Sequence, residues 1–306
     1  MKQHVIMITG ASSGFGELAA YMLAERGHVV YAGVRQFETR AIAAMKAFTK
    51  DKSKELHSVL LDLTDEQAVE AAVQRVISEQ GHIDVLIHNA GHGAMGPAEA
   101  FSTQQLQKLF DINVIGAQRL NQAALPHMRK ARRGLVMWTS SSSVKGGTPP
   151  FCGPYFAAKA AMDALAVSYS GELSRWGIES TIIVPGAYPK GTSHFADMSH
   201  PAREAVAADY YQHSYKGVLE QIVSGITALF PAQAEASEVA EAMVRVVELA
   251  HGQRPFRTHI DPSSDGCEIV NAMHDRVRAE LLRKIGLEDV LKPALTDSDG
   301  TTVNKP

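Results

Sequence analysis

Short, continuously apolar runs alternate with helical patterns along most of the chain. The runs that predict strands are Val5–Ile8, His28–Ala32, Ser58–Leu61, Ile83–Ile87, Leu135–Trp138 and Ile178–Val184. The stretches with helical spacing between them are Gly14–Arg26, Ala41–Phe48, Val69–Ile77, Thr103–Met128 and Tyr155–Trp176. Strands buried on both faces are continuously apolar, and strand–helix alternation implies parallel strands with right-handed crossovers. The pattern therefore predicts an α/β fold built on a doubly wound parallel sheet flanked by helices.

The alternation breaks beyond Pro185. Residues 190–235 contain Gly, Pro, His and Tyr without a strand pattern, and we expect a lid over the substrate, because loops of that length are usually functional or disordered. Its tyrosines either line the site or pack the lid. A helix is predicted at Ser237–Leu249 with Ser237 as N-cap, and a last strand at Phe256–Ile260. The sequence thus predicts one catalytic domain over residues 1–265 and a partly helical C-terminal extension over 266–306 with a frayed end.

A glycine-rich loop joins the first predicted strand to the first predicted helix. It reads Thr9-Gly-Ala-Ser-Ser-Gly-Phe-Gly16. Glycines at such a turn let the backbone approach a pyrophosphate, and the helix N-terminus supplies N–H donors and a favourable dipole. The loop predicts a Rossmann-like NAD(P)-binding domain. We expect the cofactor to contact Gly10, Ser12, Ser13, Gly14, Phe15 and Gly16.

Tyr155 and Lys159 stand four residues apart in the predicted helix Tyr155–Trp176. Residues at i and i+4 share one helix face, so both side chains are expected to point into the same volume. A free tyrosine has a pKa of about 10 and is a poor acid–base catalyst at neutral pH. A neighbouring positive charge lowers that pKa, so the pair predicts a general acid–base centre that also contacts the cofactor.

The end of the second predicted strand indicates which cofactor is used. A carboxylate there would accept the adenosine ribose hydroxyls and repel a 2′-phosphate. The strand is followed instead by Arg35, whose guanidinium offers donors suited to phosphate. NADP(H) is therefore the preferred prediction, and NAD(H) remains the alternative.

Composition narrows the kinds of partner, structural site and location that the chain could have. The net charge is −3, which does not favour a nucleic acid or an anionic membrane as partner. The two cysteines, Cys152 and Cys267, exclude a disulfide framework and a cysteine-based zinc site, and no metal is expected. No leader pattern precedes the first strand, and no apolar run reaches the roughly 18 residues of a membrane helix. We expect a soluble cytoplasmic protein.

Taken together, the glycine loop, His88-Asn-Ala-Gly91, the Tyr155/Lys159 pair and Pro185-Gly186 resemble the short-chain dehydrogenase/reductase family, in its single-domain branch. The likeness covers about residues 1–260. It implies cofactor contacts beyond the loop and Arg35 at Asp62, Leu63, Asn89, Ala90, Gly91, Tyr155, Lys159, Pro185, Gly186, Tyr188 and Thr192. His88 departs from the asparagine common at that position, and we expect it to have no catalytic role.

The resemblance also implies a proton relay in which Asn113 holds a water. It requires one serine beside Tyr155, within the run Thr139-Ser-Ser-Ser-Ser143. Counting from Gly134 favours Ser141 and counting back from Tyr155 favours Ser142. We expect Ser142, because that position should face Tyr155, with Ser141 as the alternative.

The predicted reaction is reversible hydride transfer between NADP(H) and the carbonyl or secondary alcohol of a small molecule. The expected pocket walls indicate a moderately apolar substrate; they are Met95, Ser141, Phe151, Cys152, Tyr188 and Phe195. A protein that binds NADPH as a redox sensor without turnover is the alternative of a different class. The resemblance further implies a homodimer or homotetramer paired through the two long helices.

Overall fold

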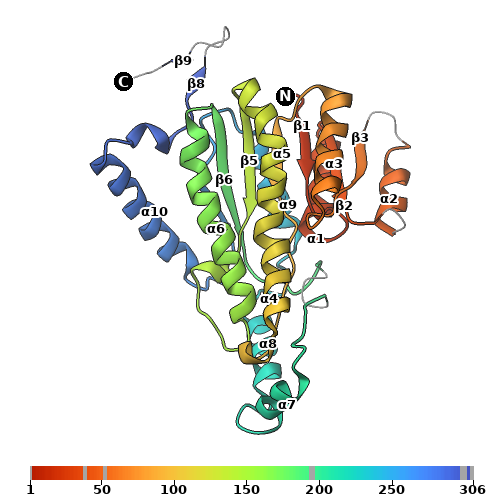
Figure 1. Ribbon diagram of the computed structural model, residues 1–306, viewed down its shortest axis with the longest axis vertical. Coiled ribbons are helices and arrows are strands. Elements are labelled where there is room, and N and C mark those ends of the chain that lie inside the picture. Colours follow the sequence, from red (N-terminus) through yellow and green to blue (C-terminus); the bar gives the residue numbers. More distant parts are fainter. Residues whose placement is uncertain (1, 37–39, 51–53, 193–196, 297–301, 304–306) are drawn as a thin grey trace.

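A seven-stranded parallel sheet forms the centre of the molecule in the computed structural model (Figure 1). The structure describes residues 2–36, 40–50, 54–192, 197–296 and 302–303. The strand order is β3-β2-β1-β4-β5-β6-β7, which confirms the predicted doubly wound topology. The strands are β1 (Val5–Ile8), β2 (Val29–Val34), β3 (Glu55–Leu60), β4 (Val85–His88), β5 (Gly134–Thr139), β6 (Ile178–Pro185) and β7 (Arg257–Ile260).

Helices cover both faces of the sheet and bury a separate apolar core on each side. The helices on one face are α3 (Glu66–Gln80), α5 (Gly116–Ala131) and α6 (Gly153–Ser174). Those on the other face are α1 (Gly14–Glu25), α2 (Arg40–Phe48) and α9 (Ser237–Glu248). Every residue of β1, β2 and β4 is buried, as expected for strands between two helix layers.

The predicted helix Thr103–Met128 is interrupted. It divides into α4 (Thr103–Phe110), a π-helical turn η2 (Asp111–Ile115) and α5. A capping box fixes the start of α4, since the Ser102 hydroxyl accepts from Gln105 N–H and the Gln105 side chain accepts from Ser102 N–H. In the π turn, the Asn113 amide donates to Leu109 O at 2.9 Å, in competition with the helical hydrogen-bond ladder. Single π turns often mark functional sites, and this one carries a predicted site residue.

Residues 190–235 contain more regular structure than predicted. Two helices, α7 (Glu204–Gln212) and α8 (Val218–Leu229), lie beyond the carboxyl ends of the strands, at the bottom of Figure 1. The predicted N-cap of α9 was wrong: the helix is preceded by Ala236, and Ser237 is its first residue. The short helices η1 (Ala98–Ala100) and η3 (Ser142–Val144) complete the connections.

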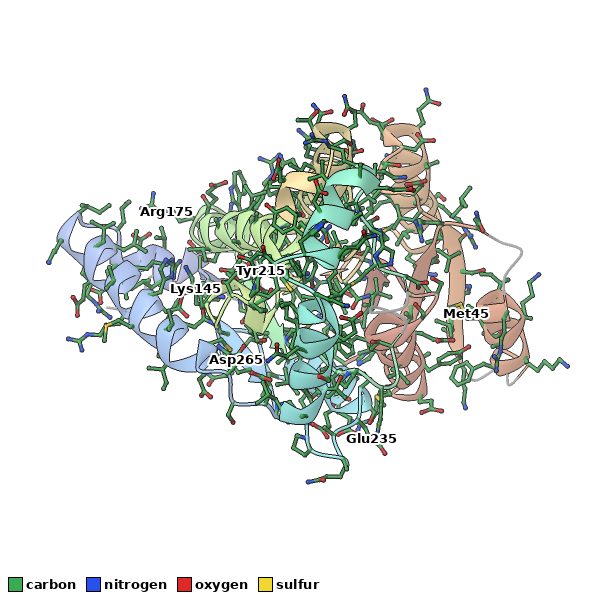
Figure 2. The ribbon with its side chains drawn as sticks, turned by 90° about the horizontal axis from the view of Figure 1, so that it is seen from below. Met45, Lys145, Arg175, Tyr215, Glu235 and Asp265 are labelled. Atoms are coloured by element: carbon green, nitrogen blue, oxygen red, sulfur yellow. The ribbon has the colours of Figure 1, made fainter. Side chains whose placement is uncertain are left out.

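The C-terminal extension consists mainly of α10 (Cys267–Lys284), followed by the turn η4 (Glu288–Leu291). Figures 1 and 2 show α10 at the margin of the molecule, beyond α6. Two short strands, β8 (Leu295–Thr296) and β9 (Thr302–Val303), pair with each other near the C-terminus. None of the described helices combines the length and apolar character that crossing a bilayer requires.

Candidate active site

A cavity of about 960 Å³ opens at the carboxyl ends of the parallel strands, where doubly wound folds bind ligands. The structure brings most of the predicted cofactor residues to its wall: Gly10, Ser12, Ser13, Gly14, Phe15, Arg35, Asp62, Leu63, Asn89, Ala90, Gly91, Tyr155, Lys159, Pro185, Gly186 and Thr192. Ser141, Ser142, Met95 and Cys152 also line it. Phe195 lies outside the described residues, so its placement in the wall stays a prediction.

The glycine loop after β1 packs directly on the loop after β4. A Cβ at Gly10, where φ is +66°, would lie 2.7 Å from Ala90 Cα, and one at Gly16 would lie 2.3 Å from Asn89 Nδ2. The Asn89 amide donates to Thr9 O at 3.0 Å and to Gly10 O at 3.2 Å. Glycine is therefore required at both positions. Gly16 is absent from the cavity wall, so its place in the loop is explained by this close packing.

Asn113 lies behind the cavity wall and ties the π turn to the loop after β4. Its Oδ1 accepts from His92 N–H at 3.1 Å, and its Nδ2 donates to His92 O at 3.0 Å and to Leu109 O at 2.9 Å. A Cβ at Gly91 would lie 3.0 Å from Asn113 Oδ1 and 3.8 Å from Lys159 Nζ. The Asn113 side chain thus sets the position of this loop beside Lys159. Both of its N–H groups are used in doing so.

Tyr155 and Ser141 are in hydrogen-bond contact, which settles which serine faces the tyrosine. Burial raises the pKa of Tyr155 to about 12, and the Ser141 hydroxyl, donating to the phenol oxygen, acts against that rise. The expectation that Ser142 faces Tyr155 was therefore wrong. Ser142 is the first residue of the 3₁₀ turn η3, whereas Ser141 precedes the turn with extended backbone and accepts from Ser143 N–H at 3.2 Å.

Lys159 is buried on the same helix, one turn after Tyr155. Its Nζ donates to Thr139 O, the last carbonyl of β5, at 2.7 Å. Burial lowers the pKa of Lys159 to about 8, and the negative charge of Asp163, one turn further along α6, acts against that fall. Lys159 therefore stays protonated at neutral pH, and its charge depends on Asp163.

Arg35 follows β2 and reaches the wall of the cavity with Asp62, which follows β3. Asp62 Oδ1 accepts from Thr64 N–H at 2.9 Å and from the Thr64 hydroxyl at 2.7 Å. The pKa of Asp62 is lowered chiefly by the Thr64 N–H, with the charge of Arg35 among the further causes. A cation and a carboxylate thus stand together at this end of the cavity.

Two predicted wall residues, Phe151 and Tyr188, do not line the cavity. Phe151 packs edge-on against three lid tyrosines, Tyr210, Tyr211 and Tyr215, at ring-centroid distances of 5.7 to 6.2 Å. None of these tyrosines lines the cavity, so of the two alternatives the structure agrees with packing within residues 190–235. Tyr188 is buried between Phe15 and Phe230, and its hydroxyl donates to Glu238 at 3.1 Å. Its role is to fix the loop after β6.

The sequence reasoning missed the side chains that close the cavity from the lid and the C-terminal side. Ile226 and Leu229 of α8, and Phe230 after it, supply an apolar wall, and Ser263 and Asp265 add polar side chains to the lining. The run Val218–Leu229 is apolar, yet the helix buries none of its residues fully. This excess of apolar residues was the available signal for a wall that faces a ligand.

His88, the residue that departs from the expected motif, is buried outside the cavity. Its Nε2 donates to Asn121 Oδ1 at 2.8 Å, and its ring lies 4.4 Å from the Trp138 ring. Burial lowers the pKa of His88 to about 4. The imidazole is therefore neutral at physiological pH and packs the core behind the site.

Comparison with known proteins agrees with this geometry. A short chain dehydrogenase family model matches residues 4–200. A 3-ketodihydrosphingosine reductase from Bacteroides thetaiotaomicron is 30% identical, covering 86% of this chain and 89% of that protein. Human 17-beta-hydroxysteroid dehydrogenase type 1 is 36% identical, over 61% of this chain and 57% of its own. A solved short-chain dehydrogenase from Streptomyces avermitilis is 26% identical, with a TM-score of 0.73 and coverage of 93% of this chain and 98% of that one.

Proposed function

The chain belongs to the short-chain dehydrogenase family, and from that premise we propose that it transfers hydride between NADP(H) and a carbonyl or secondary alcohol of a moderately apolar molecule. The observation that carries the proposal is the meeting of Tyr155, Ser141 and Lys159 on one wall of a cavity that also reaches the glycine loop. A binding-only protein would not need an acid–base group supported in this way.

The cavity residues fit a dinucleotide. The glycine loop opens at the N-terminus of α1, where backbone donors and the helix dipole suit a pyrophosphate. Arg35 offers the donors that a 2′-phosphate requires, and this supports NADP(H) over NAD(H). When bound, the nicotinamide supplies the hydride chemistry, and the protein supplies orientation and electrostatics.

In the reductive direction, Tyr155 donates its proton to the substrate oxygen as negative charge develops there. Ser141 donates a hydrogen bond to the same region and holds the oxygen beside the phenol. Lys159, protonated and bonded to Thr139 O, provides the positive charge that stabilises the phenolate left behind. Asn113 keeps the loop at Gly91 against Lys159, so the charge remains in place.

An apolar substrate is supported by the walls away from Tyr155. Met95, Cys152, Ile226, Leu229 and Phe230 present mainly hydrocarbon and sulfur surface to the cavity. Apolar walls with a few directed polar groups are typical of sites that bind hydrophobic small molecules. The names of two relatives, a ketosphingoid reductase and a hydroxysteroid dehydrogenase, point to substrates of this kind.

The test compares wild type with Tyr155→Phe in two assays. NADPH and NADH binding is followed by fluorescence titration, and turnover by nicotinamide absorbance against a panel of apolar ketones, aldehydes and secondary alcohols. We expect tighter binding of NADPH and a loss of turnover of about 100-fold or more in Tyr155→Phe, with NADPH affinity retained. Tyr169→Phe, on the same helix as Tyr155, removes a hydroxyl bonded to Gln118 of α5 and is the matched control. Undiminished turnover in Tyr155→Phe would overturn the proposal.

A further inference from the structure

Helix α10 carries a row of apolar side chains on its solvent side. Ile269, Met273, Val277, Leu281 and Ile285 recur at every fourth residue, and each exposes between 56% and 77% of its surface. Among the described residues, the other exposed large hydrophobic side chains, apart from the adjacent Val270, are scattered over several elements. We call these five residues the α10 row. A contiguous exposed apolar patch of this kind marks an interaction site.

The α10 helix is anchored by its opposite face and cannot turn the row inward. Cys267 and Asn271 are buried beneath it. Asp275 pairs with Arg257 of β7 at 2.8 Å, and Arg278 donates to the Ser170 hydroxyl of α6 at 2.7 Å. These contacts fix the rotation of α10 about its axis. The described part of the chain therefore leaves the α10 row uncovered.

We propose that a second copy of the chain covers the α10 row, with two α10 helices crossing at a two-fold axis near Val277. An interface of this type is self-complementary, and the α10 row is symmetric about its middle residue: two apolar side chains precede Val277 and two follow it. Rows at i±4 spacing are the ridges that interlock in the commonest class of helix packing.

The exposed area is compatible with such a contact. From their exposed fractions, the α10 row and the adjacent Val270 offer roughly 600 Å² per copy, so two copies could bury at most about 1,200 Å² there, the lower end of the range for specific interfaces. This contact is distinct from pairing through α4, α5 and α6, the surface on which Ile115 is exposed.

The charges beside the α10 row favour a protein partner over a lipid surface. Arg276 pairs with Glu280 at 2.8 Å, and Arg283 pairs with Glu288 at 2.8 Å, so both signs border the row. The row contains no aromatic side chain. A helix that lies on a membrane typically has a polar face rich in Lys and Arg and often carries Trp or Phe on its apolar face. A second copy of the chain brings the same charges of both signs to the contact, so charges beside one row can face opposite charges beside the other.

The test is the molar mass of the full-length protein by size-exclusion chromatography with light scattering over a dilution series. We expect Val277→Glu to halve the mass, because a charge at the crossing point cannot be buried unpaired. Leu249→Glu, at an exposed apolar position after α9, should leave the mass unchanged. Circular dichroism and NADPH binding equal to wild type show that Val277→Glu is folded.

A second variant tests the symmetry. Val277→Cys should form a disulfide-linked dimer under mild oxidation, and Leu249→Cys should not, since a disulfide requires Cα atoms within about 7 Å. The native cysteines are both buried and do not interfere. A wild-type mass that Val277→Glu does not change overturns the proposal, as does a wild type that is monomeric at every concentration. Sedimentation of such a monomer with phosphatidylcholine–phosphatidylglycerol vesicles, abolished by Val277→Glu, would assign the α10 row to lipid instead.

Discussion

Asp163, one turn after Lys159 on α6, and Arg257 of β7 form a buried, two-pronged ion pair. Arg257 Nη1 and Nη2 donate to the two Asp163 oxygens at 2.8 and 3.0 Å, and each side chain is 4% exposed. Asp163 also accepts from the Ser140 hydroxyl at 2.7 Å, and Arg257 extends the network to Asp275 of α10. The pair therefore links the end of β5, helix α6 and the C-terminal helix.

Asp163→Asn should lower the pH above which the enzyme loses activity. The Asp163 charge raises the pKa of Lys159 against burial, which lowers it to about 8. Removing the charge lowers that pKa further, so the alkaline limb of the pH–rate profile should shift to lower pH. The free energy of unfolding, measured with urea, should fall by about 3 kcal/mol, because a buried ion pair is broken.

The matched control is Asp275→Asn, which weakens the same arginine network from the more exposed α10 side. It should reduce the free energy of unfolding by less than Asp163→Asn does, and it should leave the pH of the alkaline limb unchanged. An alkaline limb that stays fixed in Asp163→Asn would show that Asp163 has only a structural role.

Ser141→Ala should reduce kcat by about 10- to 1,000-fold, whereas Ser142→Ala should change it by less than about threefold. Ser141 is the hydroxyl in contact with Tyr155, and Ser142 begins the turn that follows. Steady-state kinetics with NADPH and a reactive ketone measures both variants, and NADPH titration shows whether the cofactor site is intact. The opposite ranking of the two variants would return the role to Ser142.

The choice between Ser141 and Ser142 shows what could be predicted from the sequence and what could not. Buried strands and the glycine loop follow from local composition, so the fold and most of the cavity wall could be predicted. The facing serine depends on where β5 ends and where η3 begins, within a run of identical residues. Ser140 turns to Asp163, a contact between residues 23 apart, whereas Ser141 contacts Tyr155. No pattern in the neighbouring sequence predicts the contact between Ser140 and Asp163.

The lid illustrates a second limit. Phe151 was predicted to meet the substrate because it is aromatic and follows β5, but it packs against the tyrosines of α7 and the residues after it. Tyr188 similarly packs against Phe15 and Phe230. Aromatic side chains are suited to both core and pocket, and only the tertiary packing decides between them. The wall from α8 was missed although its apolar run stands in the sequence, because only the tertiary structure shows that this run faces the cavity.

Arg35→Ala should weaken NADPH binding by about 10- to 100-fold and leave NADH binding within about twofold. A charge-assisted hydrogen bond to phosphate contributes roughly 1.5–3 kcal/mol, and NADH lacks the 2′-phosphate. Fluorescence titration of both cofactors gives the two affinities. Arg40→Ala, which removes an exposed arginine at the start of α2, is the control and should change neither. Equal weakening of NADPH and NADH would place Arg35 away from the 2′-phosphate.

His88 should make the protein lose stability in mild acid. Burial lowers its pKa to about 4, whereas an unfolded histidine has a pKa of about 6.5. Between these values the unfolded chain binds more protons than the folded one. The free energy of unfolding should therefore fall as the pH decreases from about 6.5 to 4, by roughly 3 kcal/mol in total. Above pH 6.5 the contribution is complete and constant.

His88→Gln isolates this effect, because the glutamine amide can still donate to Asn121 Oδ1 but has no proton to gain. Urea unfolding at pH 7 and pH 5 measures the difference for each protein. The wild type should lose about 2 kcal/mol more than the variant over this interval, since one pH unit corresponds to about 1.4 kcal/mol per proton. His57→Gln, at a half-exposed histidine on β3, should keep the wild-type acid sensitivity. Equal losses in His88→Gln and wild type would mean that His88 is not the group that titrates.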